Sequence, residues 1–303
     1  MEKKTLVHIM SIAILGVATL AAVLLFFKYV KITHPYREPV ETLEHFDIET
    51  SKITIAPDTE SAGDDTGSDK TSSPCILQAT NPAGADYLSK IVIMGDRTIG
   101  EMSKYTIVEL PDQAQQVWST TDNISVFHLM EVDDFLYPKT NEFVSYLTAV
   151  KDKRPQFLIV TFGSYDDPEK IVTKDDFLAA YAEFIISAKS ATPNTQIIVQ
   201  SILPVGSNCS VIDAETIKER NTWLIDFCEA NKMYYLDTWS ALSGEDGYLQ
   251  PQYYDDIGEE DPNRDYFLND TGYKKLVDYI CTHVHPLYAE PETEAVAEDI
   301  PLI

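Results

Sequence analysis

The sequence predicts an α/β domain of three layers, with a central parallel sheet of five strands covered by helices on both faces. From about residue 85 onward, short β-branched or aromatic runs bounded by polar residues alternate with segments of helical periodicity. Such alternation is typical of a parallel sheet between two layers of helices. About 200 residues follow this pattern, which suits one domain of that kind.

The elements can be placed in order along the chain. Strands are expected at Lys90–Met94, Ile124–Leu129, Phe157–Phe162, Gln196–Ser201 and Met233–Leu236. Helices are expected around Asn141–Val150, Lys174–Lys189, Asp213–Ala230 and Asp270–His283. Ligands of such folds bind beyond the carboxyl ends of the strands, so the segments that follow each strand are the candidate site.

A membrane anchor is expected ahead of this domain. Residues Leu6–Phe27 contain no Asp, Glu, Lys or Arg. As a helix at 1.5 Å per residue they would extend roughly 33 Å, enough to cross a bilayer core. A cleaved signal peptide is the rival interpretation, but the apolar run is long and ends in Leu24–Phe27 and then Lys28, without a small-residue cleavage site. We therefore expect a transmembrane anchor over residues 1–34.

The rest of the chain divides by composition. Residues 35–84 read as an extracytoplasmic acidic linker, because Ser61–Ser73 is small, polar and acidic. The α/β domain is expected over 85–288 and an acidic tail over 289–303. Basic residues lie on both sides of the span, so the positive-inside rule is nearly balanced. We expect the domain outside the cell membrane, because a short N-terminus is usual for a signal anchor.

The charge balance excludes one class of partner. The chain has 49 acidic and 23 basic residues, a formal net charge of −26. Nucleic-acid-binding surfaces need clustered Lys and Arg, so no nucleic-acid partner is expected. The four cysteines do not form a disulfide scaffold, although a bond between Cys75 and Cys209 is left open.

Segments at the strand ends resemble the SGNH (GDSL-like) hydrolase family. They are Gly95–Gly100, Gly163–Asp166, Ile202–Val205 and Arg264–Tyr273. The resemblance covers roughly Tyr87 to Pro286, and the stretches QSILPV, YYLDTWSALSGEDGYL and FLNDTGYKKLVDYICTH, with Asn221 between the first two, are similar to membrane-anchored bacterial envelope members. It implies a flavodoxin-like α/β/α fold and acyl transfer to water.

In that family a G-D-S block supplies the nucleophilic Ser, and a D-x-x-H block supplies the base and its orienting Asp. The oxyanion is held by the Ser N–H, a Gly N–H of a second block and an Asn of a G-x-N-D block. This chain departs from the pattern at each catalytic position. Arg97 follows Gly95-Asp96 where Ser belongs, or in an alternative alignment Ser is deleted from a G-D-S-R-T variant, and the hydroxyl is missing either way. Tyr165 stands where Asn belongs. Phe267 and Arg264 align with the His and Asp, and no Gly occurs between Gly100 and Gly163.

These departures predict a catalytically inactive member with a binding, scaffolding or regulatory role in the cell envelope. The degenerate motif positions are Asp96, Arg97, Gly163, Tyr165, Asp166, Arg264 and Phe267. The ligand-binding candidates are Arg97, Thr98, Tyr165 and Phe267, and an envelope glycan or peptide is the expected ligand. No cofactor and no metal are expected; the acidic loop Asp255–Asp265 lacks EF-hand spacing and is interpreted as solvated.

Two other function classes stay open. One is an active acylesterase or deacetylase on acylated envelope glycans, using displaced residues. Its candidates are the hydroxyls of Thr98, Ser103 and Ser164 with His128 as base. The other is an extracellular domain with a purely structural role.

Several residues have both a functional and a structural interpretation. Arg97 and Arg264 are interpreted either as an anion clamp or as a plug of the old site, in which they pair with each other's acidic neighbours, Asp96 and Asp265. His283 and His285 are expected to cap the last helix. The two cysteines of the predicted amphipathic helices, Cys228 and Cys281, are expected to be small buried thiols.

Overall fold

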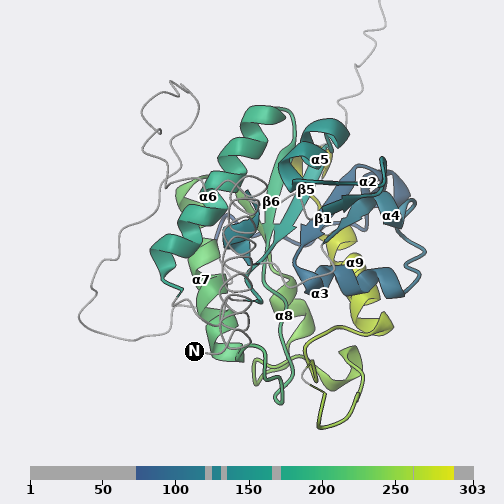
Figure 1. The fold of residues 1–303 in the computed structure, drawn as a ribbon, viewed down its shortest axis with the longest axis vertical. Coiled ribbons are helices and arrows are strands. Elements are labelled where there is room, and N and C mark those ends of the chain that lie inside the picture. The colour runs from purple at the N-terminus through teal and green to yellow at the C-terminus, as the bar shows by residue number, and fades with distance from the viewer. Residues whose placement is uncertain (1–72, 120–124, 131–134, 166–171, 262, 290–303) are drawn as a thin grey trace, which may run out of the picture. The chain divides into compact units, whose positions relative to one another are not determined.

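A computed structural model describes residues 73–119, 125–130, 135–165, 172–261 and 263–289, all within one compact unit that spans residues 53–303. Its centre is a five-stranded sheet in which every pair of neighbours is parallel (Figure 1). The strand order is β2-β1-β5-β6-β7. The strands are β1 (Ile91–Gly95), β2 (Val117–Trp118), β5 (Phe157–Thr161), β6 (Gln196–Gln200) and β7 (Tyr234–Leu236). The predicted α/β fold with a parallel five-stranded sheet is confirmed.

Helices cover both faces of this sheet, as Figure 1 shows. One face carries α5 (Tyr146–Lys153), α6 (Lys174–Ala191) and α7 (Ala214–Ala230). The other face carries α2 (Ala85–Ser89), α3 (Arg97–Gly100), η3 (Glu101–Lys104), α8 (Thr238–Leu242) and α9 (Asp270–Thr282). The remaining elements are α4 (Gln113–Gln116), η4 (Val126–His128), the antiparallel hairpin β3 (Phe135–Tyr137) and β4 (Glu142–Val144), η5 (Pro251–Tyr253) and α10 (Pro286–Ala289).

The long helices begin where a side chain caps their first turn. Thr173 accepts the N–H of Asp176 at the start of α6, and Asp213 accepts the N–H of Thr216 at the start of α7. Asn269 does the same for Gly272 at the start of α9. Each cap satisfies one of the four N–H groups that a helix start leaves without an internal partner. The predicted starts of these three helices therefore agree with the structure to within a residue.

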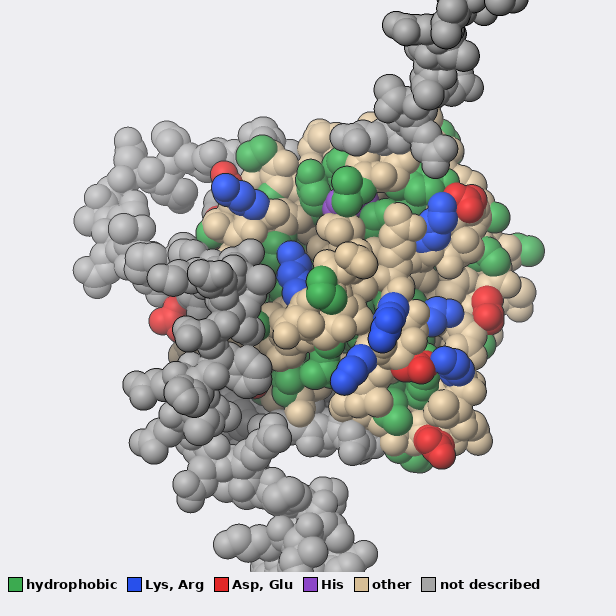
Figure 2. Space-filling model, turned by 90° about the horizontal axis from the view of Figure 1, so that it is seen from above, with side chains coloured by type: hydrophobic (Ala, Val, Ile, Leu, Met, Phe, Trp, Pro, Cys, Tyr) green, Lys and Arg blue, Asp and Glu red, His purple; other side chains and the backbone are tan. Residues whose placement is uncertain are grey.

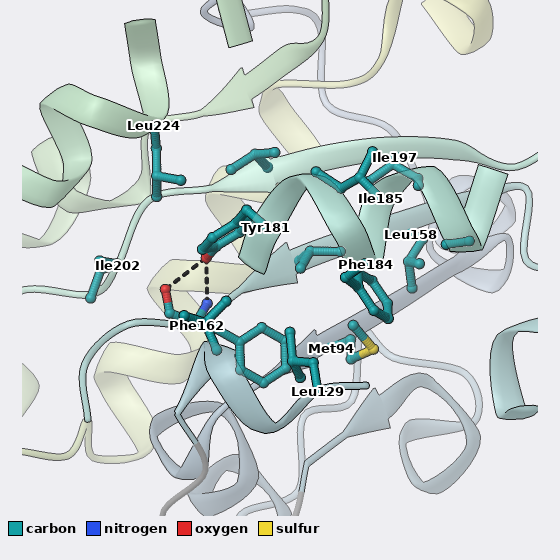
Figure 3. Packing of buried hydrophobic residues seen from close by; sticks show 14 of the residues in the cluster. Met94, Leu129, Leu158, Phe162, Tyr181, Phe184, Ile185, Ile197, Ile202 and Leu224 are labelled. Carbon is teal, nitrogen blue, oxygen red and sulfur yellow. Dashed lines mark hydrogen bonds between the residues drawn. The ribbon is translucent and has the colours of Figure 1, made fainter. Parts of the chain in front are cut away.

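The core lies in two layers because the strands are buried on both faces. All five residues of β1 and all five of β5 are buried. Ile91 and Ile93 point toward α2 and α9, whereas Val92 and Met94 point toward the α5–α6–α7 face, as the period of two in a strand requires. Figure 3 shows the layer between the sheet and the α5–α6–α7 face. There the hydroxyl of Tyr181 donates to the carbonyl of Phe162 at 2.6 Å and accepts its N–H at 2.8 Å.

One predicted strand is wrong. Ile124–Leu129 is not part of the sheet; its described residues include the 3₁₀ turn η4, and the fifth strand is the two-residue β2. Ser125 caps this turn by accepting the N–H of Phe127 at 3.4 Å. Val126 and Leu129 are both buried, three residues apart, so the apolar residues follow helical rather than strand spacing.

The helix predicted at Asn141–Val150 begins later than expected. Residues 142–144 form strand β4, and α5 starts at Tyr146 after Ser145, whose side chain accepts the N–H of Thr148 at 3.2 Å. Asn141 adopts φ 57°, a left-handed conformation suited to the turn of the β3–β4 hairpin. The hairpin turn and the Ser cap together set the boundary.

The packed part of the chain includes residues assigned above to the linker. Cys75, Ile76 and Leu77 are buried, and Ile76 forms a parallel bridge with Tyr235 of β7. Tyr235 donates its N–H to the carbonyl of Cys75 at 2.9 Å, and Leu77 donates to that of Tyr235 at 2.8 Å. This segment is too short to show a strand pattern, so the boundary at residue 85 is too late.

The predicted span Leu6–Phe27, most of the linker and the tail over 290–303 lie outside the described residues. Within the part of the chain that is described, no helix combines the length and apolarity needed to cross a bilayer. The membrane anchor therefore stays a prediction.

Candidate functional site

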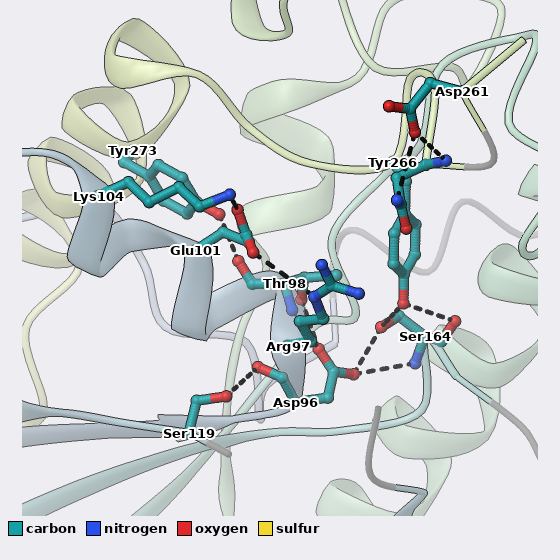
Figure 4. A network of polar contacts seen from close by, with 11 residues as sticks. Asp96, Arg97, Thr98, Glu101, Lys104, Ser119, Ser164, Asp261, Tyr266 and Tyr273 are labelled. Carbon is teal, nitrogen blue, oxygen red and sulfur yellow. Dashed lines mark hydrogen bonds and ion pairs between the residues drawn. The ribbon is translucent and has the colours of Figure 1, made fainter. Parts of the chain in front are cut away.

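The candidate site lies at the carboxyl edge of the sheet, where two strands end side by side. Asp96 follows β1 and caps α3, and Gly163 and Ser164 come shortly after β5, the strand that pairs with β1. The loop containing Arg264, Tyr266 and Phe267 reaches the same place from a distant part of the chain, because the Tyr266 hydroxyl contacts Ser164 (Figure 4). The structure thus gathers the motif positions that the sequence separates.

The centre of this network is the Asp96 carboxylate, which accepts four hydrogen bonds. One oxygen accepts the N–H of Thr98 at 3.0 Å and its hydroxyl at 2.6 Å. The other accepts the N–H of Ser164 at 3.1 Å and its hydroxyl at 2.6 Å. Asp96 is 2% exposed, so both oxygens are directed at the fold itself. Its role is to join the end of β1 to the loop after β5.

Burial dominates the ionisation of this group. Desolvation raises the pKa of Asp96 above the ordinary aspartate value, although the hydrogen bonds from Ser164 and Thr98 act in the opposite direction. The Tyr266 hydroxyl lies 2.9 Å from that of Ser164, and burial also raises the pKa of Tyr266, so the phenol is neutral. Asp96, Ser164 and Tyr266 therefore form one buried hydrogen-bonded chain.

Arg97 and Phe267 lie against each other. The guanidinium carbon lies 5.0 Å from the centre of the Phe267 ring, a cation–π contact. The Phe267 ring in turn packs on Tyr266, with ring centres 4.7 Å apart. Arg97 also pairs with Glu101, Nε to carboxylate at 3.5 Å, and its side chain is 31% exposed. The Asp96 carboxylate faces Thr98 and Ser164 and pairs with neither Arg97 nor Arg264.

Arg264 is held by its own neighbour. Its Nε lies 3.8 Å from the buried carboxylate of Asp265, an ion pair that is too long for a hydrogen bond. Asp265 also accepts the N–H of Asn208 at 3.2 Å and its amide group at 2.9 Å. Asp265 has φ 60°, and a Cβ on Gly206 would come within 2.6 Å of the Asp265 Cβ. The tight packing around Asp265 fixes the backbone next to Tyr266.

Gly163 keeps the backbone role of a glycine. It has φ +119°, and a Cβ there would lie 2.8 Å from the Phe177 ring, so only glycine fits. Its carbonyl accepts a hydrogen bond from the buried Arg220 at 2.7 Å. Tyr165 is half-buried beside Ser164, and Asp166 lies outside the described residues.

Thr98, expected as a ligand contact, is 3% exposed. Its hydroxyl donates to Asp96, and its carbonyl accepts the Tyr273 hydroxyl. Ser164 is 1% exposed, with its hydroxyl held between Asp96 and Tyr266. Both side chains support the fold, so Thr98 is corrected from a ligand contact to a structural residue. Ser103 is exposed on η3, and the side chain of His128 lies outside what the structure describes.

The other two histidines of the domain lie at the opposite edge of the sheet. The ring of His285 packs 5.3 Å from Phe157, the first residue of β5, and 4.7 Å from Tyr234, the first residue of β7. At about 3.3 Å per residue, the length of β5 alone separates this ring from the candidate site by roughly 13 Å. His283 stacks on Tyr279 at 3.7 Å with its Nδ1 3.0 Å from that residue's carbonyl, a contact at the end of α9.

The family relation follows from the sequence of the domain. Residues 138–275 match the model of the GDSL-like Lipase/Acylhydrolase family. These residues form a GDSL-like hydrolase domain. The matched stretch begins after Gly95-Asp96-Arg97, the segment in which a GDSL-like hydrolase carries its nucleophile.

Solved structures similar to this GDSL-like chain come from several bacteria. A lipolytic protein assigned to the G-D-S-L family from Desulfitobacterium hafniense is 19% identical, with 65% of this chain and 99% of that chain covered and a TM-score of 0.44. A protein described as a platelet activating factor from Streptococcus pneumonia is 18% identical, covering 63% and 81%, also at 0.44. A GDSL-like lipase from Bacteroides thetaiotaomicron is 17% identical, covering 63% and 85%, at 0.39. No curated protein matches the chain.

The four cysteines of the GDSL-like domain are buried or half-buried. All four cysteines are free, so the bond considered between Cys75 and Cys209 is not formed. Burial raises the pKa of each thiol, to about 11 for Cys281, which keeps them protonated and weakly nucleophilic at neutral pH. Among the described residues, no three His, Cys, Asp or Glu side chains are grouped so as to hold a metal ion.

Sequence reasoning missed the contacts that hold this site together. The Asp96–Ser164–Tyr266 chain joins residues 68 and 102 positions apart, and no local pattern predicts such pairs. One signal was available: Asp96 followed by Thr98 has the form of a helix cap, which the structure shows at the start of α3.

Proposed function

We propose that this GDSL-like domain does not hydrolyse esters and instead serves a binding, scaffolding or regulatory role at the outer side of the membrane to which Leu6–Phe27 anchors it. The observation that carries the proposal is the stack of Arg97 on Phe267. These two residues align with the nucleophilic Ser and the catalytic His of the family. Where a hydroxyl and an imidazole would meet, this chain places a cation against an aromatic ring.

The chemistry of acyl transfer explains why this loss is severe. A hydroxyl attacks an ester only when a base within hydrogen-bond reach takes its proton. The hydroxyls of Ser164 and Thr98 donate hydrogen bonds to a buried carboxylate, and both side chains are too buried to reach a substrate. The imidazoles of His283 and His285 pack at the other edge of the sheet. Removing a triad typically lowers the rate by on the order of 10⁴ to 10⁶, even when the oxyanion hole persists.

The former catalytic edge is left as a partly open aromatic and cationic surface. Arg97 retains 31% of its side-chain exposure beside Phe267, and Glu101 balances its charge at 3.5 Å. Such a surface suits a carboxylate-bearing glycan or peptide better than a neutral ester, because a guanidinium binds carboxylates in bidentate form. A bound anion would compete with Glu101, so affinity at this site is expected to be modest.

The test of the proposal is active-site labelling of the full-length chain in detergent. The chain should not react with a fluorophosphonate probe, and its hydrolysis of p-nitrophenyl acetate should equal that of heat-unfolded protein. A variant carrying Arg97→Ser, Arg264→Asp and Phe267→His serves as the matched control, because it restores the family residues on the same scaffold. Stoichiometric labelling of any Ser or Thr in the unmodified chain would establish the rival function, an acylesterase with displaced residues.

A further inference from the structure

Basic residues gather at one edge of this acidic domain. Figure 2 looks onto the edge of the sheet where the strands begin, and several Lys and Arg side chains lie across it. A base precedes each of the strands β1, β5, β6 and β7 at this edge. It lies next to the start of the strand or at the end of the preceding helix. The seven bases of this edge, called the basic edge below, are Lys90, Lys139, Lys151, Lys153, Arg154, Lys189 and Lys232.

Most bases of the basic edge form no ion pair. Lys90 pairs with Asp86 and Lys139 pairs with Asp152, each at 2.6 Å. The other five bases are exposed and form no ion pair with any residue that the structure describes. Acids lie among these bases, including Asp86 and Asp152 in the two pairs and Glu229 in the last turn of α7, but the seven bases outnumber them. The other acids of this chain of net charge −26 lie elsewhere. Many follow the strands at the opposite edge, including the six acids of the loop Asp255–Asp265.

Helix dipoles explain the position of only some of the bases at the basic edge. Lys151 and Lys153 lie in the last turn of α5 and Lys189 in the last turn of α6, where cations stabilise the exposed carbonyls. Arg154 and Lys232 lie just beyond helix ends, with φ 49° and 53°. Glycine is the common residue at such left-handed positions because it adopts them without strain. At two such places this chain carries a base instead.

The described part of the domain begins at the same edge. Residues 75–77 run parallel to β7, so Ser73 lies toward the end at which β7 begins. Its hydroxyl donates to the carboxylate of Glu229 at 3.2 Å, in the last turn of α7 and three residues before Lys232. The described chain therefore begins beside the basic edge, on the side of the predicted span Leu6–Phe27 in the sequence.

We propose that the basic edge docks on the anionic lipid headgroups of the membrane that carries the anchor. The inference rests on the proposed membrane attachment and adds the orientation of the domain. Docking turns the opposite, acidic edge away from the bilayer, and with it Arg97, Phe267 and the rest of the candidate site. The ligands are the phosphate groups of the anionic lipid headgroups. The Lys and Arg side chains attract them electrostatically, each as a separate positive charge.

The net charge does not oppose this docking at physiological ionic strength. Asp175 and Lys189 mark the two ends of α6, about 20 Å apart at 1.5 Å per residue. The Debye length is about 8 Å in 0.15 M salt, so the lipid surface interacts with the near edge and hardly with the far one. Tethering also raises the effective concentration of the domain at the surface to about the millimolar range, so weak contacts suffice.

The experiment uses the full-length chain reconstituted into vesicles. One set is phosphatidylcholine alone, and the other is equal parts of phosphatidylcholine and phosphatidylglycerol, each with a nitroxide quencher on a headgroup. A dye is attached at Thr140→Cys, in the hairpin turn at the basic edge, or at Glu245→Cys, in the turn after α8 at the opposite edge. Both positions are exposed, and the chain without an added cysteine supplies the background from the native thiols.

Docking predicts quenching of the dye at position 140 only in vesicles that contain phosphatidylglycerol, and none at position 245 in either set. The quenching should disappear in 1 M salt, where the Debye length is about 3 Å. Neutralising three bases of the edge should lower the ratio of docked to undocked domain by on the order of 100-fold, and neutralising three bases elsewhere should not. The edge variant is Lys151→Gln, Lys153→Gln, Arg154→Asn, and its matched control is Lys218→Gln, Lys274→Gln, Lys275→Gln.

Equal quenching at both positions, or equal loss in both charge variants, would overturn the docking proposal. The proposal would also fail if the fluorescence of the dye at position 140 did not change with phosphatidylglycerol but changed with a soluble anionic polymer such as single-stranded DNA. The edge would then bind a different class of partner. Failure of the anchor is detected separately: the chain would not co-float with phosphatidylcholine vesicles. A chain that co-floats without lipid-dependent quenching retains the membrane attachment and loses only the docking.

Discussion

His285 should make the domain less stable as the pH falls through the range in which free histidine becomes charged. The residue is 3% exposed and packs between Phe157 and Tyr234. Its Nδ1 lies 3.2 Å from the N–H of Leu287, which donates to it, and only an unprotonated nitrogen accepts such a bond. Burial lowers the pKa of His285 to about 4. The folded domain therefore holds a neutral imidazole that its unfolded chain would protonate near pH 6.5.

The magnitude follows from linkage. Because the folded pKa is lower than the unfolded one, the folded state binds fewer protons, and the stability that His285 contributes is lost as the pH falls from 6.5 toward 4. A difference of roughly 2.5 pH units at 1.36 kcal/mol per unit corresponds to about 3 kcal/mol. This is a large part of the 5–15 kcal/mol that holds a typical domain folded.

The assay is urea unfolding of the chain and of His285→Asn between neutral pH and pH 4. The Asn oxygen lies near the place of Nδ1 and keeps an acceptor for the N–H of Leu287, but it does not titrate. The variant should be less stable at neutral pH because it loses the ring packing, and its deficit should shrink by about 3 kcal/mol at pH 4. His283 is present in both proteins and cancels in the difference. Parallel stability curves for the two proteins would refute the reasoning.

Four further substitutions and one fractionation test the rest of the structure. Asp96→Ala should cost about 2–6 kcal/mol in urea unfolding, because two buried N–H groups lose their acceptor, whereas Thr98→Val should cost about 1 kcal/mol. Tyr181→Phe should cost about 2–3 kcal/mol by leaving the N–H and carbonyl of Phe162 unpaired; a neutral result would contradict Figure 3. Arg97→Ala should cost about 1 kcal/mol, and a loss well above this would assign Arg97 a buried structural role. Full-length protein should sediment with membranes, and protease added to intact cells should release the domain.

The parts of the fold that follow from local chemistry were predictable. Three long helices start at side-chain caps, and β1, β5, β6 and β7 are continuous apolar runs, so sequence pattern and structure agree there. Strand β2 has only Val117 and Trp118, which is too short for any periodicity to mark. The run Ile124–Leu129 misled because its β-branched residues favour a strand, while the cap at Ser125 and the burial of residues three apart favour a turn.

The candidate site divides in the same way. The positions of Arg97, Arg264 and Phe267 were predictable because they follow motif fragments along the chain. Their partners were not predictable, since Arg97 contacts Phe267 across 170 residues and Glu101 within one helical turn. The Asp96 carboxylate is not available to either arginine, because it already accepts four hydrogen bonds, two from Thr98 of α3 and two from Ser164. The two donors on Thr98 follow from the local helix cap, whereas the two on Ser164 are 68 positions away and no local pattern predicts them.

The entry segment beside β7 has a consequence for engineering. Pro74 and Ala289 line one hollow of about 440 Å³ together with Tyr234, so the first and last parts of the packed domain lie close to each other. A short Gly-Ser connection could therefore close the domain into a ring, and new ends could be opened in the exposed turn at Glu245–Asp246. Such a circular permutant would be joined to its membrane anchor at the opposite edge of the sheet. Its Arg97–Phe267 surface would face the bilayer, and the basic edge would face outward. The same module would then present the other side to its surroundings without a change in any packed residue.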